Sequence, residues 1–146
     1  MRTSAVRSAI AAAIAAISAD NKAGARDKFV WLKTGQRDPR SSVDRTFTLK
    51  LSAQPQRAES EAISTFVVEY QLAVYYVSTT SMDGGGAEDR IGEDAERIYA
   101  AMDRLHEQNA EINLCAPTPI GVIETEGLIE VRWSLVVNYR LTTGVE

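Results

Sequence analysis

Residues Leu128 to Leu141 read LIEVRWSLVVNYRL, and this stretch decides the fold class. Its odd-numbered positions are all apolar or aromatic: Ile129, Val131, Trp133, Leu135, Val137, Tyr139 and Leu141. Successive side chains of a strand point to opposite faces of a sheet. The stretch therefore predicts a half-buried strand whose odd-numbered face, with Trp133 near its centre, packs on a core.

Two earlier stretches have the same period of two. Arg45 to Ser52 places Phe47, Leu49 and Leu51 on one face. Ile63 to Val77, ISTFVVEYQLAVYYV, places the following residues on one face: Phe66, Val68, Tyr70, Leu72, Val74 and Tyr76. If straight, this second strand would span about 50 Å, so we expect it to bend or to project beyond the sheet.

The remaining strand signals are shorter. Ala53 to Ala62, which contains Pro55, is predicted to be a polar connection. After Pro117 and Pro119, Ile120 to Glu124 is predicted to be a short strand that turns at Thr125 to Gly127. Lys28 to Thr34 fits either a short strand or an anchored loop.

Two segments have helical periodicity. Near the start, a helix from about Ser4 to Ser18 would carry one apolar stripe of Val6, Ile10, Ile14 and Ile17, with Thr3 or Ser4 as N-cap. The first twenty residues also imitate a secretory signal peptide, but this stripe favours the helix. The second helix, Glu88 to Gln108, would bury a stripe of Ile91, Ala95, Ile98, Met102 and Leu105.

The predicted order is therefore α-β-β-α-β-β. Strands joined by short turns, with both helices free to cover one face, predict an α+β fold. We expect an antiparallel sheet of about four strands packed against two helices, in a single domain over residues 1–146 with the N-terminal amphipathic helix at 4–18.

Composition excludes several classes of function. The 146 residues carry sixteen basic and twenty acidic side chains, a net charge of −4, and no dense basic run that would grip nucleic acid. No apolar run is long enough to cross a membrane. Cys115 is the only cysteine, so no internal disulfide forms, which fits a reducing cytoplasm.

No motif indicates an enzyme. The run Gly84-Gly85-Gly86 lacks the lysine of a Walker loop, and Asp89 stands where a Rossmann turn needs its third glycine. The carboxylates of Glu88, Asp89, Glu93, Asp94 and Glu96 are expected to be a solvated helix start rather than a metal site. His106 and Cys115 have no partners in a catalytic pattern. We therefore expect no catalytic residue, no metal and no cofactor.

The order of elements and several stretches resemble the tail-terminator (tail-completion) proteins of long-tailed bacteriophages. The stretches are the N-terminal amphipathic helix, Arg45-x-Phe47-x-Leu49, the Tyr-rich strand Phe66 to Tyr76, the acidic helix entry Ile91 to Ile98, and the strand Ile129 to Arg140. Together they cover nearly the whole chain, as patterns of residue type.

The resemblance implies a non-enzymatic virion protein that is assembled in the host cytoplasm. Such a protein forms a hexameric ring on the head-proximal end of the tail tube, where it ends tube polymerisation and joins tail to head. Its partners would be copies of itself, the tail tube protein and a head-side neck or connector protein, with DNA only passing through the lumen and no membrane contact.

The polar loops are the expected subunit contacts of this ring, because long loops in compact domains tend to carry contacts. The candidate interface residues are Gln36, Arg37, Arg40, Asp83, Glu88 and Asp89. Two alternatives stay open: a head-side neck or head–tail joining protein, and, from another class, a small α+β ligand-binding or enzymatic domain.

Overall fold

The computed structural model describes residues 2–19, 28–33, 44–57, 65–77, 86–125 and 127–140. Within these ranges the chain forms three helices and one five-stranded sheet. The elements are α1 (Thr3–Ala15), β1 (Val30–Trp31), β2 (Thr46–Arg57), β3 (Thr65–Val77), α2 (Gly86–Asp103), α3 (Leu105–Gln108), β4 (Ile112–Thr125) and β5 (Leu128–Arg140). The mixed α+β class is thus confirmed, whereas the count of four strands is wrong.

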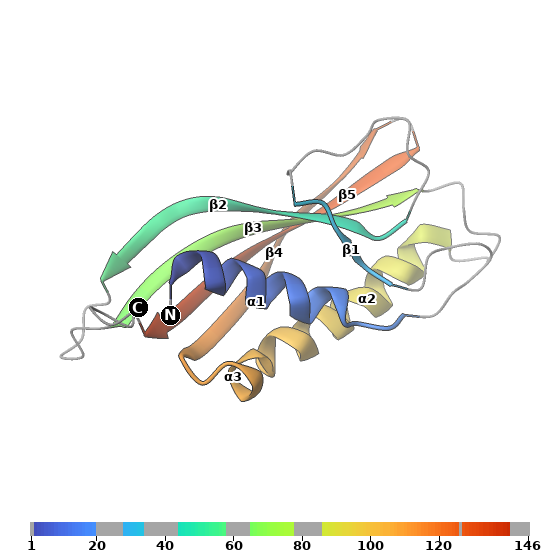
Figure 1. The fold of residues 1–146 in the computed structure, drawn as a ribbon. Helices are drawn as coiled ribbons and strands as arrows, with labels where there is room; N and C mark the ends of the chain where they lie inside the picture. Colours follow the sequence, from blue (N-terminus) through green and yellow to red (C-terminus); the bar gives the residue numbers. More distant parts are fainter. Residues whose placement is uncertain are drawn as a thin grey trace.

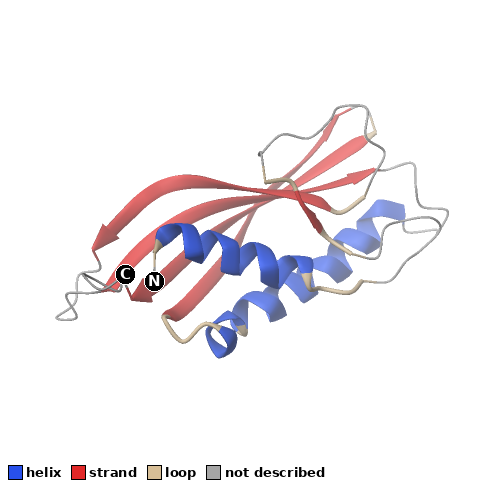
Figure 2. Cartoon of the chain, viewed as in Figure 1, coloured by secondary structure: helices blue, strands red, loops and turns tan. Residues whose placement is uncertain are grey.

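The strands lie in the order β1-β2-β3-β5-β4 (Figure 1). The short β1 is parallel to β2, and every other neighbouring pair is antiparallel. The last of the described strands, β5, is therefore internal to the sheet and pairs with β3 from Thr65–Arg140 to Val77–Leu128 without a register break. Both long helices lie on the same face of this sheet (Figure 2).

The face predicted for β5 is confirmed. Its odd-numbered residues from Ile129 to Tyr139 are all buried, and Trp133 is only 3% exposed. They share one core with the alternate residues of β3, which include Tyr70, Leu72 and Tyr76. Leu141 lies outside the described residues.

Strand β2 is longer than predicted and is buried only in its first half. The expected connection at 53–62 is wrong over its first five residues, because β2 continues through Pro55 to Arg57. Two register shifts against β3, after Leu51 and after Ala53, accommodate extra residues in β2. The strand is bent along its length in Figure 1. Leu51, expected in the core with Phe47 and Leu49, is 53% exposed.

Strand β4 begins eight residues before the predicted strand and includes both prolines. Proline is tolerated in a sheet where its nitrogen faces away from the neighbouring strand, and β4 is an edge strand. From Thr118 onward every residue of β4 is exposed, so this half of the strand carries no core face and shows only a short apolar run in the sequence.

Helix α1 buries Val6, Ile10, Ala11 and Ile14, close to the expected stripe. The predicted N-cap is wrong, because the cap position is Arg2 and carries no side-chain capping bond. The hydroxyl groups of two tyrosines form hydrogen bonds with the first turn instead. Thr3 Oγ1 lies 2.8 Å from the Tyr139 hydroxyl, and the Tyr70 hydroxyl donates to the Thr3 carbonyl at 3.2 Å.

The second predicted helix is divided at Arg104 into α2 and α3. Ile98, Met102 and Leu105 are buried as expected, while Ile91 and Ala95 are only partly buried. The fully buried positions before Ile98 are instead Arg90 and Asp94. The buried stripe of α2 therefore begins with charged side chains.

Candidate functional site

Of the six predicted interface residues, the structure describes two. Glu88 and Asp89 lie in the first turn of α2, where both are exposed. Gln36, Arg37, Arg40 and Asp83 lie outside the described residues, as do Gly84 and Gly85. The structure therefore leaves the predicted pairing of these loops as a prediction.

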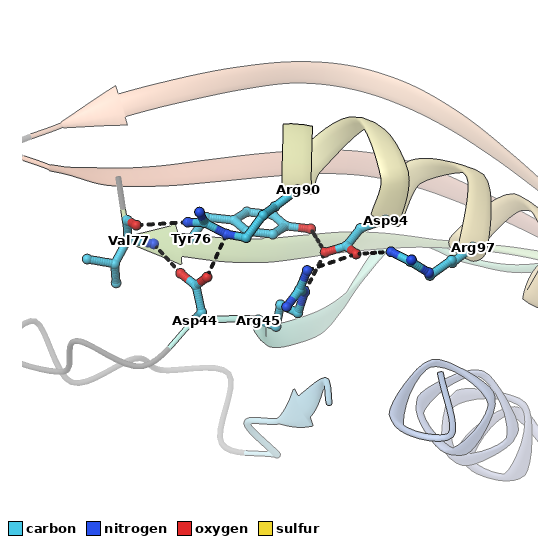
Figure 3. A network of polar contacts seen from close by, with 7 residues as sticks. All are labelled: Asp44, Arg45, Tyr76, Val77, Arg90, Asp94 and Arg97. Atoms are coloured by element: carbon cyan, nitrogen blue, oxygen red, sulfur yellow. Dashed lines mark hydrogen bonds and ion pairs between the residues drawn. The ribbon is translucent and has the colours of Figure 1, made fainter. Parts of the chain in front are cut away.

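A buried network of polar side chains lies between β2, β3 and α2 (Figure 3). Arg45, which directly precedes β2, donates two hydrogen bonds to Asp94 of α2: Nε to Oδ2 at 2.6 Å and Nη2 to Oδ1 at 3.2 Å. Neither side chain has any exposed surface. Arg45 has a positive φ of 59°, a left-handed conformation uncommon for a residue with a side chain.

Two further donors complete the environment of Asp94. The Tyr76 hydroxyl donates to Oδ2 at 2.8 Å and Arg97 Nη1 donates to Oδ1 at 3.0 Å. Burial, and after it the negative charge of Asp94, raises the pKa of Tyr76 well above its usual value of 10.0, so this hydroxyl remains a donor. The carboxylate therefore accepts four bonds, which is about its full capacity.

A second buried ion pair lies beside the first one. Arg90 Nε lies 2.9 Å from Asp44 Oδ2, and Arg90 Nη2 donates to the Val77 carbonyl at 3.0 Å. Asp44 Oδ1 in turn accepts the Val77 amide proton at 2.6 Å. The two ion pairs attach the start of α2 to the beginning of β2 and the end of β3.

The expectation of a solvated helix start is therefore wrong for Asp94. Asp94 lies on the same helix stripe as Arg90 and Ile98, with successive members four positions apart, and this spacing was the available signal. With its oxygens occupied by four donors, Asp94 has no lone pair left for a metal or a substrate proton. The network ties α2 to the beginning of β2 and to β3.

The other two candidate reactive groups, Cys115 and His106, lie in different surroundings. Cys115 is buried, with Sγ 3.6 Å from Met102 Sδ. Burial, with a smaller contribution from Asp103, raises the pKa of Cys115 from 9.0 to about 12, so the nucleophilic thiolate is rare. His106 is exposed on α3. Among the residues that the structure describes, no group of acidic, histidine and cysteine side chains is arranged to hold a metal ion.

A groove of about 320 Å³ lies between α1 and the last turns of α2. Most of its wall is small and apolar, and Arg97, Arg104 and Gln108 supply its long polar side chains. Arg97 is already bonded to Asp94.

The edge strand β4 carries the largest group of exposed aliphatic side chains in the described chain. Leu114, Ile120, Val122 and Ile123 are 43–61% exposed. Scattered single apolar residues are normal on a surface, whereas these four lie along one strand at the edge of the sheet. Sequence reasoning placed Ile120 to Glu124 in a strand without recognising that both of its faces are exposed.

Comparison of the chain with known protein families and with curated protein sequences finds no match. Within the described ranges, none of the helices has the combination of length and apolar character that a membrane crossing requires. The fold and the surfaces described above are therefore the basis for any functional assignment.

Proposed function

We propose that this chain is a non-enzymatic structural protein of a bacteriophage tail or neck, and that it is the tail terminator. In this role it forms a ring of its own copies, with the tail tube protein on one side and a head-side neck protein on the other. It ends tube polymerisation, offers the filled head a docking surface and lets DNA pass through its lumen. It is assembled in the host cytoplasm and remains in the virion.

The exposed aliphatic edge of β4 is the observation that carries this proposal. An enzyme concentrates its perturbed ionisable groups in a cleft, whereas here the buried Asp94 carboxylate is occupied by Arg45, Tyr76 and Arg97, and the exposed apolar residues follow a sheet edge. A subunit that works only inside an assembly needs such an edge for its neighbours.

The test is removal of the gene from the phage or prophage that encodes the chain, followed by electron microscopy of the lysate. A terminator is expected to leave tails of irregular, excessive length without heads, and a plasmid copy should restore normal particles. Tails of normal length that fail to join heads would instead identify the head-side neck protein. Normal virions would refute both and favour the small ligand-binding or enzymatic domain.

The six predicted interface residues belong to this proposal. Exposed ion pairs contribute only about 0–1 kcal/mol each, so they must act together around a closed ring. Reversal of Glu88 and Asp89 to arginine should therefore reduce plasmid rescue in the deletion strain. Glu96→Arg, on the exposed surface of the same helix, is the matched control. Equal rescue by both variants would remove Glu88 and Asp89 from the interface.

A further inference from the structure

Opposite charges are divided along this chain. Residues 1–57 contain eleven basic and four acidic side chains, whereas residues 58–146 contain five basic and sixteen acidic ones. A net charge of −4 therefore conceals a strongly basic first segment and a strongly acidic remainder. Such an asymmetry affects association more than it affects the fold.

In the folded chain, the basic and the acidic segments lie at opposite edges of the sheet. Helix α1 contacts β1 and β2, at one edge of the sheet, whereas α2 and α3 contact β4 at the other edge. The solvent-accessible charges described in α1, β1, β2 and their flanks are all basic: Arg2, Arg7, Lys28, Lys33, Lys50 and Arg57. Those on the opposite side are mainly acidic: Glu88, Asp89, Glu93, Glu96, Asp103, Glu107, Glu111 and Glu124.

On the acidic side, half of the β4 edge is closed to another strand. Pro117 and Pro119 have no N–H to donate, and both nitrogens must face outward for β4 to pair with β5. The stretch from Ile120 to Thr125 has no proline and is exposed throughout. It is therefore the open part of this edge, and it contains Ile120, Val122 and Ile123.

On the basic side, the β2 edge is closed at both ends. Strand β1 pairs only with Thr46 and Phe47, and the next outward carbonyl, that of Leu49, accepts Arg7 Nε and Nη2 at 3.4 Å each. Pro55 lacks a donor farther along the strand. Among the described residues, the part of this edge without a neighbouring strand therefore runs from Leu51 to Gln54, and Leu51 is 53% exposed.

The two open edges have matching faces and directions. Leu51 pairs with Tyr70 and Val122 pairs with Val131; both partners are buried under the helices, so Leu51 and Val122 belong to the helix-covered face. The antiparallel order gives β2 and β4 opposite directions. When the same sheet is repeated head to tail, β4 is therefore antiparallel to β2 of the next copy.

We propose that the open part of β4 docks on the open part of β2 in a second copy of this chain, head to tail, with Val122 opposite Leu51. In an antiparallel register this places Glu124 opposite Leu49, where Arg7 and Lys33 lie. Aliphatic contact and opposite charge then coincide. Two β4 edges brought together would instead place acidic side against acidic side.

This contact is heterologous, so its repetition closes a ring when the rotation permits. Closure on a phage tail rests on the function proposed above, whereas the contact itself does not. It joins only a few residues between blocked ends, so we expect it to form at high local concentration rather than in dilute solution.

Cysteine cross-linking distinguishes the arrangements. Leu51→Cys and Val122→Cys variants are treated with a short bismaleimide, separately and mixed, at high protein concentration. We expect a covalent dimer only in the mixture and a ladder of oligomers from the double variant. The unsubstituted chain, whose cysteine is buried, is the blank, and Glu96→Cys mixed with Leu51→Cys is the matched control. A dimer from Val122→Cys alone, or none in the mixture, overturns the proposal.

Charge reversal provides the second measurement. Glu124→Arg should lower the initial rate of the mixed cross-link by about tenfold, and pairing it with Lys33→Glu on the other chain should restore the rate. Asp103→Arg, an exposed reversal on α2, should change it less. Cross-linking without any effect of gene removal on tails would refute the tail function alone. Altered tails without the mixed cross-link would refute this contact alone.

Discussion

Arg45 and Asp94 form a two-point ion pair, Nε–Oδ2 2.6 Å and Nη2–Oδ1 3.2 Å, with no solvent exposure on either side chain (Figure 3). They are 49 positions apart in the chain and join the beginning of β2 to the third turn of α2. The pair, with Tyr76 and Arg97, determines how α2 lies on the sheet.

Removal of Asp94 should be the most destabilising single change in this network. Asp94→Ala leaves the buried Arg45 guanidinium without its anion, which typically costs about 3–5 kcal/mol of unfolding free energy. Urea unfolding followed by circular dichroism measures this loss. Glu96→Ala, exposed on the same helix, should change stability by less than about 0.5 kcal/mol. A loss of equal size in both variants would contradict the role given to the ion pair.

Alkaline conditions should weaken the fold through Tyr76. Its pKa is raised in the folded chain by burial and by Asp94, while in the unfolded chain it titrates near 10.0. The folded state therefore holds the proton longer, and the contribution of Tyr76 is intact below pH 10 and declines above it. Unfolding free energies measured from about pH 9 to pH 11 should fall less steeply for Tyr76→Phe than for the unsubstituted chain. Parallel slopes would contradict this prediction.

Trp133→Ala should lower the unfolding free energy by about 3–5 kcal/mol. Trp133 is 3% exposed, and its ring meets the Tyr99 ring edge-on at a centroid distance of 5.2 Å. Val136→Ala, a truncation on the more exposed face of β5, should cost less than about 1 kcal/mol. Denaturant titration of the two variants compares the faces directly, and similar losses would show that the register is misassigned.

Cys115 should resist alkylation until the chain unfolds. A pKa raised from 9.0 to about 12 makes its thiolate about a thousandfold rarer at neutral pH, and burial also blocks the reagent. Iodoacetamide labelling followed by mass spectrometry should be slow in native buffer and fast in urea. Rapid native labelling would show that the thiol is accessible.

Period-two patterns predicted the internal strands because burial on one face leaves a regular signal. The alternate residues of β3 and the odd residues of β5 are examples. The edge strands were predicted less well. Pro55, Pro117 and Pro119 suggested breaks, yet each lies within a strand whose outer edge requires no N–H there.

The buried polar network was not predicted. Its members come from β2, β3 and α2, and nothing in local sequence indicates that Arg45 will meet Asp94. Charged residues in a first helical turn are commonly solvated, and that general tendency concealed the four-residue spacing of Arg90, Asp94 and Ile98. A buried charge can be recognised from sequence only when its partner is also known.

The bond between Thr3 and Tyr139 places the second-to-last described residue of the sheet against the first turn of α1. During synthesis α1 leaves the ribosome before β5, so the surface of the sheet on which α1 packs is incomplete until β5 follows. Because β5 lies between β3 and β4, the described strand that is translated after the other four is also the one that joins the sheet together. A stalled or shortened chain would thus expose the apolar stripe of α1 and an unpaired β3, which are surfaces that chaperones bind and that aggregate.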